Sequence, residues 1–295
     1  MAAFTSTDRR GGSRDRIDAR WQPRARRAHR LIEERPHTAA LLGFYVALLE
    51  LQTAAAGAVE LDASLAAVTA SDGPPLLRFE RLPLDVWSVP FHEFCRQMPE
   101  VAPPPVVVAA QALAHAAAYH RAEVLLGVLS AGDVTGTASA VGVDPGPLAF
   151  LGRAFLSPQA ERLAELARPG DQDPRASTCP TCGWPAQVSK LEDETGAEGN
   201  RRLICAFCAT DWVFPRSVCV ECGTTGDEGL EFHADETLTY VRVEACRSCR
   251  HYLKTVDRRV LGLAEPLVED LATPELDLWA AEQGLEKRVP NLLGF

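Results

Sequence analysis

Four short stretches decide how the C-terminal half of this chain folds: Cys179-Pro180-Thr181-Cys182, Cys205-Ala206-Phe207-Cys208, Cys219-Val220-Glu221-Cys222 and Cys246-Arg247-Ser248-Cys249. In each stretch two residues separate the cysteines, so both sulfurs can bind one metal ion, and two such pairs complete a tetrahedral four-thiolate site. The stretches also repeat, because Cys219 follows Cys179 by 40 residues and Cys246 follows Cys205 by 41. We therefore expect two tandem rubredoxin-like or zinc-ribbon-like modules.

The repeat predicts which pairs share a metal ion. Joining the first pair with the second, and the third with the fourth, keeps the two units alike, whereas joining the second with the third would break the symmetry. The expected metal ligands are Cys179, Cys182, Cys205 and Cys208 in the first site and Cys219, Cys222, Cys246 and Cys249 in the second. Gly183 and Gly223 directly follow the first pair of each unit and suit a tight turn around a sulfur, since glycine accepts unusual backbone angles. Ala209 and Arg250 follow the second pairs and suit that turn less well.

The remaining cysteine usage argues against disulfides. Eight of the nine cysteines lie between residues 179 and 249, and the start of the chain is polar and Arg-rich without the apolar run of a secretory signal. We therefore expect a cytoplasmic protein, and in a reducing compartment paired cysteines more often bind metal than form disulfides. Cys95 lies among Phe91, Phe94 and Met98 and is expected to be a buried thiol.

The composition predicts an α+β protein with two unlike halves. Residues 24–168 are rich in Ala and Leu and predict a helical bundle, preceded by a flexible Arg-rich extension over residues 1–23. Pro and Gly mark residues 169–178 as a linker. Beyond the linker we expect the first metal module at 179–214, the second at 215–262, and a C-terminal helix and tail at 263–295.

Hydrophobic patterns and capping residues predict the individual elements. The expected helices of the first half cover Arg24–Glu34, Ala39–Ala70, Trp87–Met98 and Val106–Ser130, with further helix starts at Asp144-Pro145 and Ser157-Pro158. The strand-like segments are 202–204, 212–214 and 239–243, and a helix capped by Thr273 covers Pro274–Gln283. The most apolar stretch, Val106–Leu129, contains several charged and polar side chains, so we expect no membrane span.

Charge narrows the class of function. The chain carries a net charge of −10, and residues 176–295 hold 12 Lys and Arg against 20 Asp and Glu, which is −8. Eight thiolates with two divalent ions would make this part more acidic still, so it is poorly suited to nucleic acid. A four-thiolate site has no open position for a substrate, and we find no phosphate loop, activated serine or paired carboxylates. We expect no catalytic residues. A client-binding accessory protein, a zinc-ribbon nucleic-acid binder and a rubredoxin-like electron carrier remain as alternatives, the first being favoured.

Several stretches resemble the FdhE family of formate dehydrogenase accessory proteins. They are Cys179 to Pro185, Arg202 to Trp212, Glu244 to Asp257, and the ending from Asp277 to Phe295. The resemblance implies a cytoplasmic maturation factor, not an enzyme, that contacts the catalytic subunit of formate dehydrogenase. It implies that the eight cysteines are the functional residues and that they hold two metal ions, iron by resemblance, with zinc fitting the same ligands. We expect Lys190–Asn200, Thr224–Glu236 and the apolar C-terminus to form the recognition surface.

Overall fold

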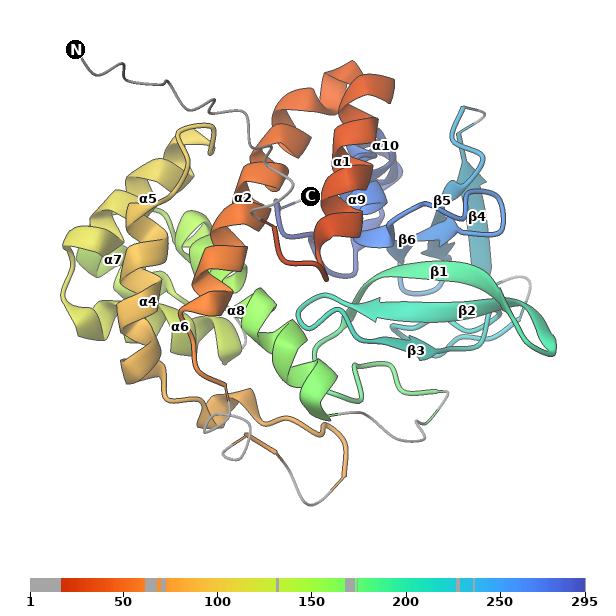
Figure 1. Cartoon of the computed structure of the whole chain (residues 1–295). Helices are drawn as coiled ribbons and strands as arrows, with labels where there is room; N and C mark the ends of the chain where they lie inside the picture. Colours follow the sequence, from red (N-terminus) through yellow and green to blue (C-terminus); the bar gives the residue numbers. More distant parts are fainter. Residues whose placement is uncertain are drawn as a thin grey trace, which may run out of the picture.

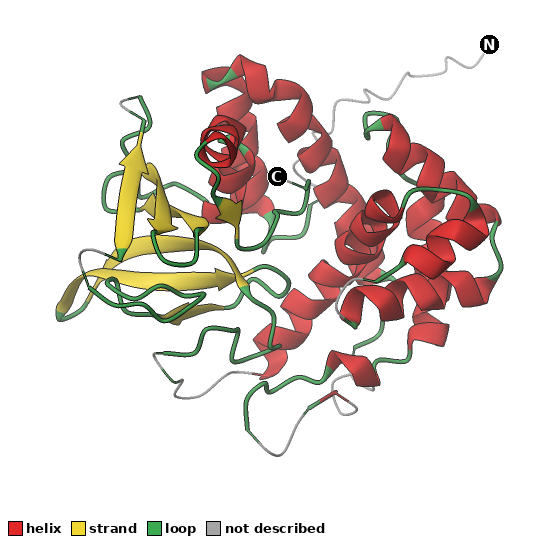
Figure 2. Ribbon diagram, turned by 180° about the vertical axis from the view of Figure 1, so that it is seen from behind, coloured by secondary structure: helices red, strands yellow, loops and turns green. Residues whose placement is uncertain are grey.

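The computed structural model describes residues 17–61, 68–69, 73–130, 133–167, 173, 175–226, 229–235 and 237–294. The expected α+β fold is confirmed, with the helices of the N-terminal half gathered on one side and the strands on the other (Figures 1 and 2). Half of the predicted linker, residues 169–172 and 174, lies outside the described residues, and so do residues 1–16 of the predicted N-terminal extension.

The helical part contains α1 Gln22–Glu34, η2 Pro36–Thr38, α2 Ala39–Gly57, η3 Phe79–Arg81, α4 Leu84–Arg96, α5 Pro104–His115, α6 Ala118–Leu129, α7 Thr135–Val141 and α8 Pro145–Ala167. Helix α2 contacts α1, α4 and α8 and is apolar nearly all round, which is why it lies in the middle of the bundle (Figure 1). In the described part of the chain, Pro36–Gly57 is the one helical stretch long and apolar enough to cross a membrane, and more than half of it is buried inside the protein.

Two predicted boundaries differ from the structure. Ile17 and Trp21 are buried, so the last residues assigned to the flexible extension belong to the folded core. Trp21 is held there because its indole Nε1 donates a hydrogen bond of 2.8 Å to Glu161 of α8. The long helix predicted from Ala39 to Ala70 ends at Gly57, where glycine weakens helix propagation.

The predicted helix start at Ser157-Pro158 is wrong, because both residues lie inside the continuous helix α8. A proline inside a helix has no N–H for the carbonyl four residues earlier. That carbonyl belongs to Ala154, and the Gln52 side chain of α2 donates a 2.8 Å hydrogen bond to it. A neighbouring helix thus satisfies the group that Pro158 leaves free.

The strands form one sheet. They are β1 Ala186–Glu194, β2 Ala197–Cys205, β3 Asp211–Val213, β4 Leu230–Ala234, β5 Val241–Cys246, β6 His251–Asp257 and β7 Glu286–Lys287. The order is β3-β2-β1-β6-β5-β4, with β7 beside β6. Each metal module therefore supplies three antiparallel strands, β1 to β3 in the first and β4 to β6 in the second.

The two modules are joined side by side through a parallel pairing of β1 with β6, from Val188 with Lys254 to Leu191 with Asp257. Across this junction Arg201 of β2 forms a 2.7 Å ion pair with Glu244 of β5, and both side chains are almost fully buried. Arg201 also donates hydrogen bonds to the carbonyls of Pro215 and Val218 in the segment between the modules. The tandem units therefore share one sheet and one buried ion pair.

Helices α9 Pro266–Leu271 and α10 Pro274–Glu282 cover one face of this sheet. The completely buried Lys254 of β6 contacts Asp270 at 2.9 Å and Asp277 at 2.7 Å, so its charge is paired on both sides. Thr273 was expected to cap α10, but its hydroxyl donates to the Glu269 carbonyl and accepts a hydrogen bond from Lys254. The cap is replaced by a link between the helices and the sheet.

Candidate metal centres

The first cysteine cluster brings together the two pairs that the repeat predicts. Cys179 and Cys182 lie in the turn before β1, while Cys205 ends β2 and Cys208 follows in the turn to β3. All four sulfurs lie within 4.8 Å of one another. The Cys179 and Cys208 Sγ atoms are 3.6 Å apart, and those of Cys182 and Cys205 are 3.4 Å apart.

The second cluster repeats the first in the other module. Cys219 and Cys222 precede β4, Cys246 ends β5, and Cys249 lies in the turn to β6. The sulfurs again lie within 4.8 Å of one another, with 3.7 Å between Cys219 and Cys249 and between Cys222 and Cys246. The grouping of first with second and third with fourth pairs is therefore confirmed.

The turns around the sulfurs follow the repeat as well. Gly183 and Gly223 have φ of +79° and +74°, and each donates its N–H to the carbonyl of the first cysteine in its pair. Ala209 and Arg250 occupy the same place after the second pairs and also have positive φ, +54° and +63°. A side chain there costs conformational energy, which the structure tolerates in order to close the turn.

The donor set fits a tetrahedral metal ion. Four sulfurs about 2.3 Å from a central ion form a tetrahedron with edges of about 3.8 Å, close to the sulfur–sulfur distances above. Burial raises the pKa of the Cys182 and Cys205 thiols, whereas hydrogen bonds from the neighbouring thiols lower the pKa of Cys179. One thiolate is thus stabilised by its neighbours, and a cation is needed to ionise all four.

The first cluster lies against the helical domain. All four of its cysteines are buried, and they belong to the same apolar core as α4, α5 and α8. Backbone hydrogen bonds join Leu76 and Leu77 to the carbonyls of Pro180 and Thr181, inside the first cysteine pair. Phe207, inside the second pair, stacks on Trp184 with ring centroids 4.3 Å apart.

The helix α8 also sends a cation to this cluster. Arg153 donates hydrogen bonds of 2.9 Å to the Ala206 carbonyl and 3.0 Å to the Gln187 side chain. Burial lowers the pKa of Arg153 to about 10, and the nearby Cys205 opposes that shift. Nothing local in the sequence marks Arg153, because Ala206, whose carbonyl it binds, lies 53 residues further along the chain.

The second cluster lies near the surface. Cys222 is exposed and Cys249 is half-buried. A hydrogen bond with the Thr224 hydroxyl and one from its backbone lower the pKa of Cys222 to about 6. Arg288 approaches this cluster as Arg153 does the first, and it lies 3.3 Å from Glu221.

Cys95 occupies the place expected of it, and two histidines near the second module have partners other than a metal ion. Cys95 is buried, and burial raises the pKa of its thiol. His251 hydrogen-bonds to the Cys249 carbonyl through Nδ1, and the His233 ring packs on Trp279 at 4.4 Å, so neither ring needs to bind a metal ion.

Comparison with known proteins gives consistent matches. A model of the FdhE central domain matches residues 178–216, and a model of the FdhE C-terminal domain matches residues 218–293. An FdhE homolog of Aquifex aeolicus is 36% identical over 154 residues, covering 52% of this chain and 54% of the relative. One from Stutzerimonas stutzeri is 32% identical over 151 residues, covering 50% and 49%. These alignments span about half the length of the relatives.

A solved structure matches over almost the whole chain. The crystal structure of the FdhE protein from Pseudomonas aeruginosa has a TM-score of 0.72 and 26% sequence identity, covering 92% of this chain and 94% of that one. The fold and the two clusters define a metal-binding protein with a tandem pair of four-cysteine modules joined to a helical domain. Together with the domain models, the match identifies the group: residues 178–293 belong to the FdhE family, and almost the whole chain shares the fold of an FdhE protein.

Proposed function

We propose that the protein is an accessory factor for the maturation of formate dehydrogenase, that it binds the catalytic subunit of that enzyme in the cytoplasm, and that it is not itself an enzyme. Membership of the FdhE family is the observation that carries this proposal. The four-cysteine clusters support it, because a site whose four positions are all filled by protein sulfurs offers none to a substrate.

The eight cysteines are proposed to hold two metal ions, iron by family resemblance or zinc by ligand chemistry. A bound ion would supply a crosslink between the two cysteine pairs of each module. Around the first cluster, the chain's own residues do the rest: Arg153 offsets thiolate charge, and Trp184 and Phe207 exclude water. Such a site stabilises a surface, and it performs no reaction.

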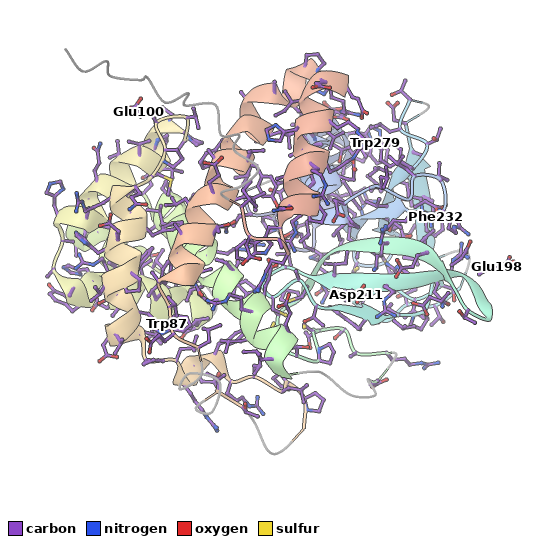
Figure 3. All side chains as sticks on the ribbon, viewed as in Figure 1. Trp87, Glu100, Glu198, Asp211, Phe232 and Trp279 are labelled. Atoms are coloured by element: carbon purple, nitrogen blue, oxygen red, sulfur yellow. The ribbon has the colours of Figure 1, made fainter. Side chains whose placement is uncertain are left out.

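We propose a client surface that keeps two of the three expected parts, Lys190–Asn200 and Thr224–Glu236, and omits the C-terminal tail. Lys190–Asn200 is largely the β1–β2 hairpin, whose tip carries Glu198 far from the helices (Figure 3). The C-terminal tail is used internally, because Leu292 and Leu293 pack on the helical core and Arg153 binds the carbonyls of Pro290 and Asn291. Recognition is therefore assigned to the strands of the metal modules, and the tail is left out of it.

A deletion strain of the native host tests the proposal. Without this protein, formate dehydrogenase activity should be lost under conditions that require the enzyme, and the tagged protein should retain the catalytic subunit in a pull-down. Full activity in the deletion strain would refute the proposal. Complementation with a Cys219→Ser/Cys222→Ser variant would show whether the second cluster is needed for the activity.

The exposed second cluster favours one competing function, that of a rubredoxin-like electron carrier. Electron transfer needs a metal site close to the surface, and Cys222 reaches it. Metal analysis with an absorption spectrum separates the two functions. Colourless zinc would exclude the carrier, whereas iron that cycles reversibly at a cellular potential would support it. The third alternative, nucleic-acid binding, gains no support from an acidic domain.

A further inference from the structure

The strand β4 forms a free edge of the sheet. In the repeat β4 corresponds to β1, because Arg247 N donates to the Gly229 carbonyl just as Ala206 N donates to the Pro185 carbonyl. The far edge of β1 is covered by β6, which runs parallel to it. Within the described part of the chain, β4 pairs with β5 alone. The outer edge of β1 is thus paired with β6, whereas the corresponding edge of β4 has no partner strand among the described residues.

The register identifies the backbone groups on this edge. In an antiparallel pair, residues alternate between those that exchange hydrogen bonds with the partner strand and those that point away. Gly229 bonds Arg247, so Glu231 and His233 also face β5. Leu230, Phe232 and Ala234 therefore direct their N–H and C=O groups outward, toward the position of a further strand.

A large apolar side chain marks the same strand. Phe232 is 49% exposed, and the Arg242 guanidinium lies 4.7 Å from its ring centroid. Figure 3 shows Phe232 on the side of the sheet remote from the helical domain, so the helices do not shield it. A strand added to an edge gains affinity from backbone hydrogen bonds and specificity from side chains such as this one.

The charge around β4 specifies its partner. Residues 216–247, which contain β4 and β5, carry seven Asp and Glu against three Arg, a net charge of −4 before the thiolates are counted. Two of these arginines lie beside β4, where Arg247 pairs with Glu231 and Arg242 lies over the Phe232 ring. Soluble proteins often protect an edge strand with lysine, and this edge has none. An acidic surround favours a basic segment and repels acidic ones.

We propose that the outer edge of β4 binds an extended, basic segment of the client protein by parallel strand addition, as β6 pairs with β1. The inference rests on the proposed function, which supplies the client. It assigns recognition to Leu230, Phe232 and Ala234.

The test compares two substitutions at one outward-facing position in the full-length protein. Ala234→Pro removes the outward N–H, and an edge strand tolerates proline on its solvent side. Ala234→Val keeps the N–H and is the matched control. The probes are the purified catalytic subunit of formate dehydrogenase and overlapping 15-residue peptides that span it. Thermal unfolding and metal content establish that both variants are folded.

We expect the bound peptides to be basic, and we expect Ala234→Pro to raise the dissociation constants of subunit and peptides about tenfold or more, with Ala234→Val near wild type. Hydrogen exchange at the amides of Leu230 and Phe232 should slow on binding in the wild-type protein. If both variants bind the subunit equally, and hydrogen exchange at Leu230 and Phe232 does not slow, the proposed binding at the β4 edge is wrong. The proposed maturation role would then still stand.

The remaining outcomes are also decisive. Failure of the wild-type protein to bind the catalytic subunit would overturn the proposed function and this inference with it. Concentration-dependent self-association that Ala234→Pro abolishes would instead assign the edge to a second copy of the chain.

Discussion

The two cysteine clusters have the same motif, the same turns and nearly the same sulfur–sulfur distances, yet they lie in opposite environments. The first is buried in a core that the helical domain shares, whereas the second exposes Cys222 on its own hairpin. A C-x-x-C repeat therefore determines the local geometry of the sulfurs. The elements packed around each cluster determine how much of the fold the bound metal ion stabilises. The first cluster supports both halves of the molecule, and the second supports one edge of the sheet.

Removing the first cluster should have the largest effect. Replacing Cys179 and Cys182 by Ser removes two ligands, and metal–thiolate bonding contributes on the order of 10 kcal/mol, comparable with the stability of a whole domain. This cluster shares a core with α4, α5 and α8. We therefore expect the helical domain of the variant to unfold at a lower temperature and over a broader range than in the wild type. Thermal unfolding followed by circular dichroism measures this. An unchanged unfolding transition of the helices in the variant would contradict this prediction.

The matched change in the second cluster should have a local effect. In a Cys219→Ser/Cys222→Ser variant we expect the loss of one metal equivalent and faster hydrogen exchange in β4 and β5, with the helices unchanged. Metal analysis and hydrogen exchange measure both. Simultaneous loss of both ions would show that the clusters are coupled more tightly than their environments indicate.

A chelator distinguishes the two clusters in the unmodified protein. Exposure of Cys222 gives a competing ligand access to the second cluster, so we expect release in two phases, the second cluster first. Release of both metal ions in a single phase would contradict the proposed difference in accessibility between the two clusters. The Cys219→Ser/Cys222→Ser variant is the control, since it should lack the faster phase.

The ion pair between the modules should have an intermediate effect. Glu244→Gln leaves the Arg201 guanidinium buried without its counter-charge, and breaking a buried pair typically costs about 3–5 kcal/mol. Chemical denaturation measures the loss. Replacing both residues by apolar ones is the control, because it should recover most of that stability. No loss in the single variant would mean that the modules are independent despite sharing a sheet.

The smallest expected effect is a gain. Ala209 has φ of +54° at the position that Gly183 and Gly223 occupy in the other turns. Ala209→Gly should relieve this strain and stabilise the protein by about 1 kcal/mol or less, since glycine also has more freedom to lose on folding. The melting temperature reports the sign. A decrease would show that the Ala209 methyl contributes more through packing than it costs in the backbone.

The sequence predicted what depends on local spacing. The grouping of the eight cysteines, the turns at Gly183 and Gly223, and the helices from Gln22 and Pro274 follow from residues a few positions apart. Helix ends were predicted less well, and Ser157-Pro158 shows the reason. A proline signals a boundary unless another helix satisfies the free carbonyl, and Gln52, about 100 residues away, does so.

Other features depend on pairings between distant segments. The parallel pairing of β1 with β6 joins the two modules in one sheet, whereas the repeat alone predicts two separate modules. Neither Arg153 beside the first cluster nor Lys254 beneath α9 and α10 carries a local signal, because each is defined by partners on other elements. A single sequence gives no spacing from which such contacts could be inferred.

Helix α9 implies an order of assembly. Its six residues are too few to be helical in isolation. Glu269 binds Arg27 of α1, while the adjacent Asp270 binds Lys254 and Lys287 of the sheet, and both carboxylates are fully buried. Neither charge can be buried before its partner is in place. The helix can therefore form only after the bundle and the sheet have each been built, and its closure is expected to be the late folding step that joins them.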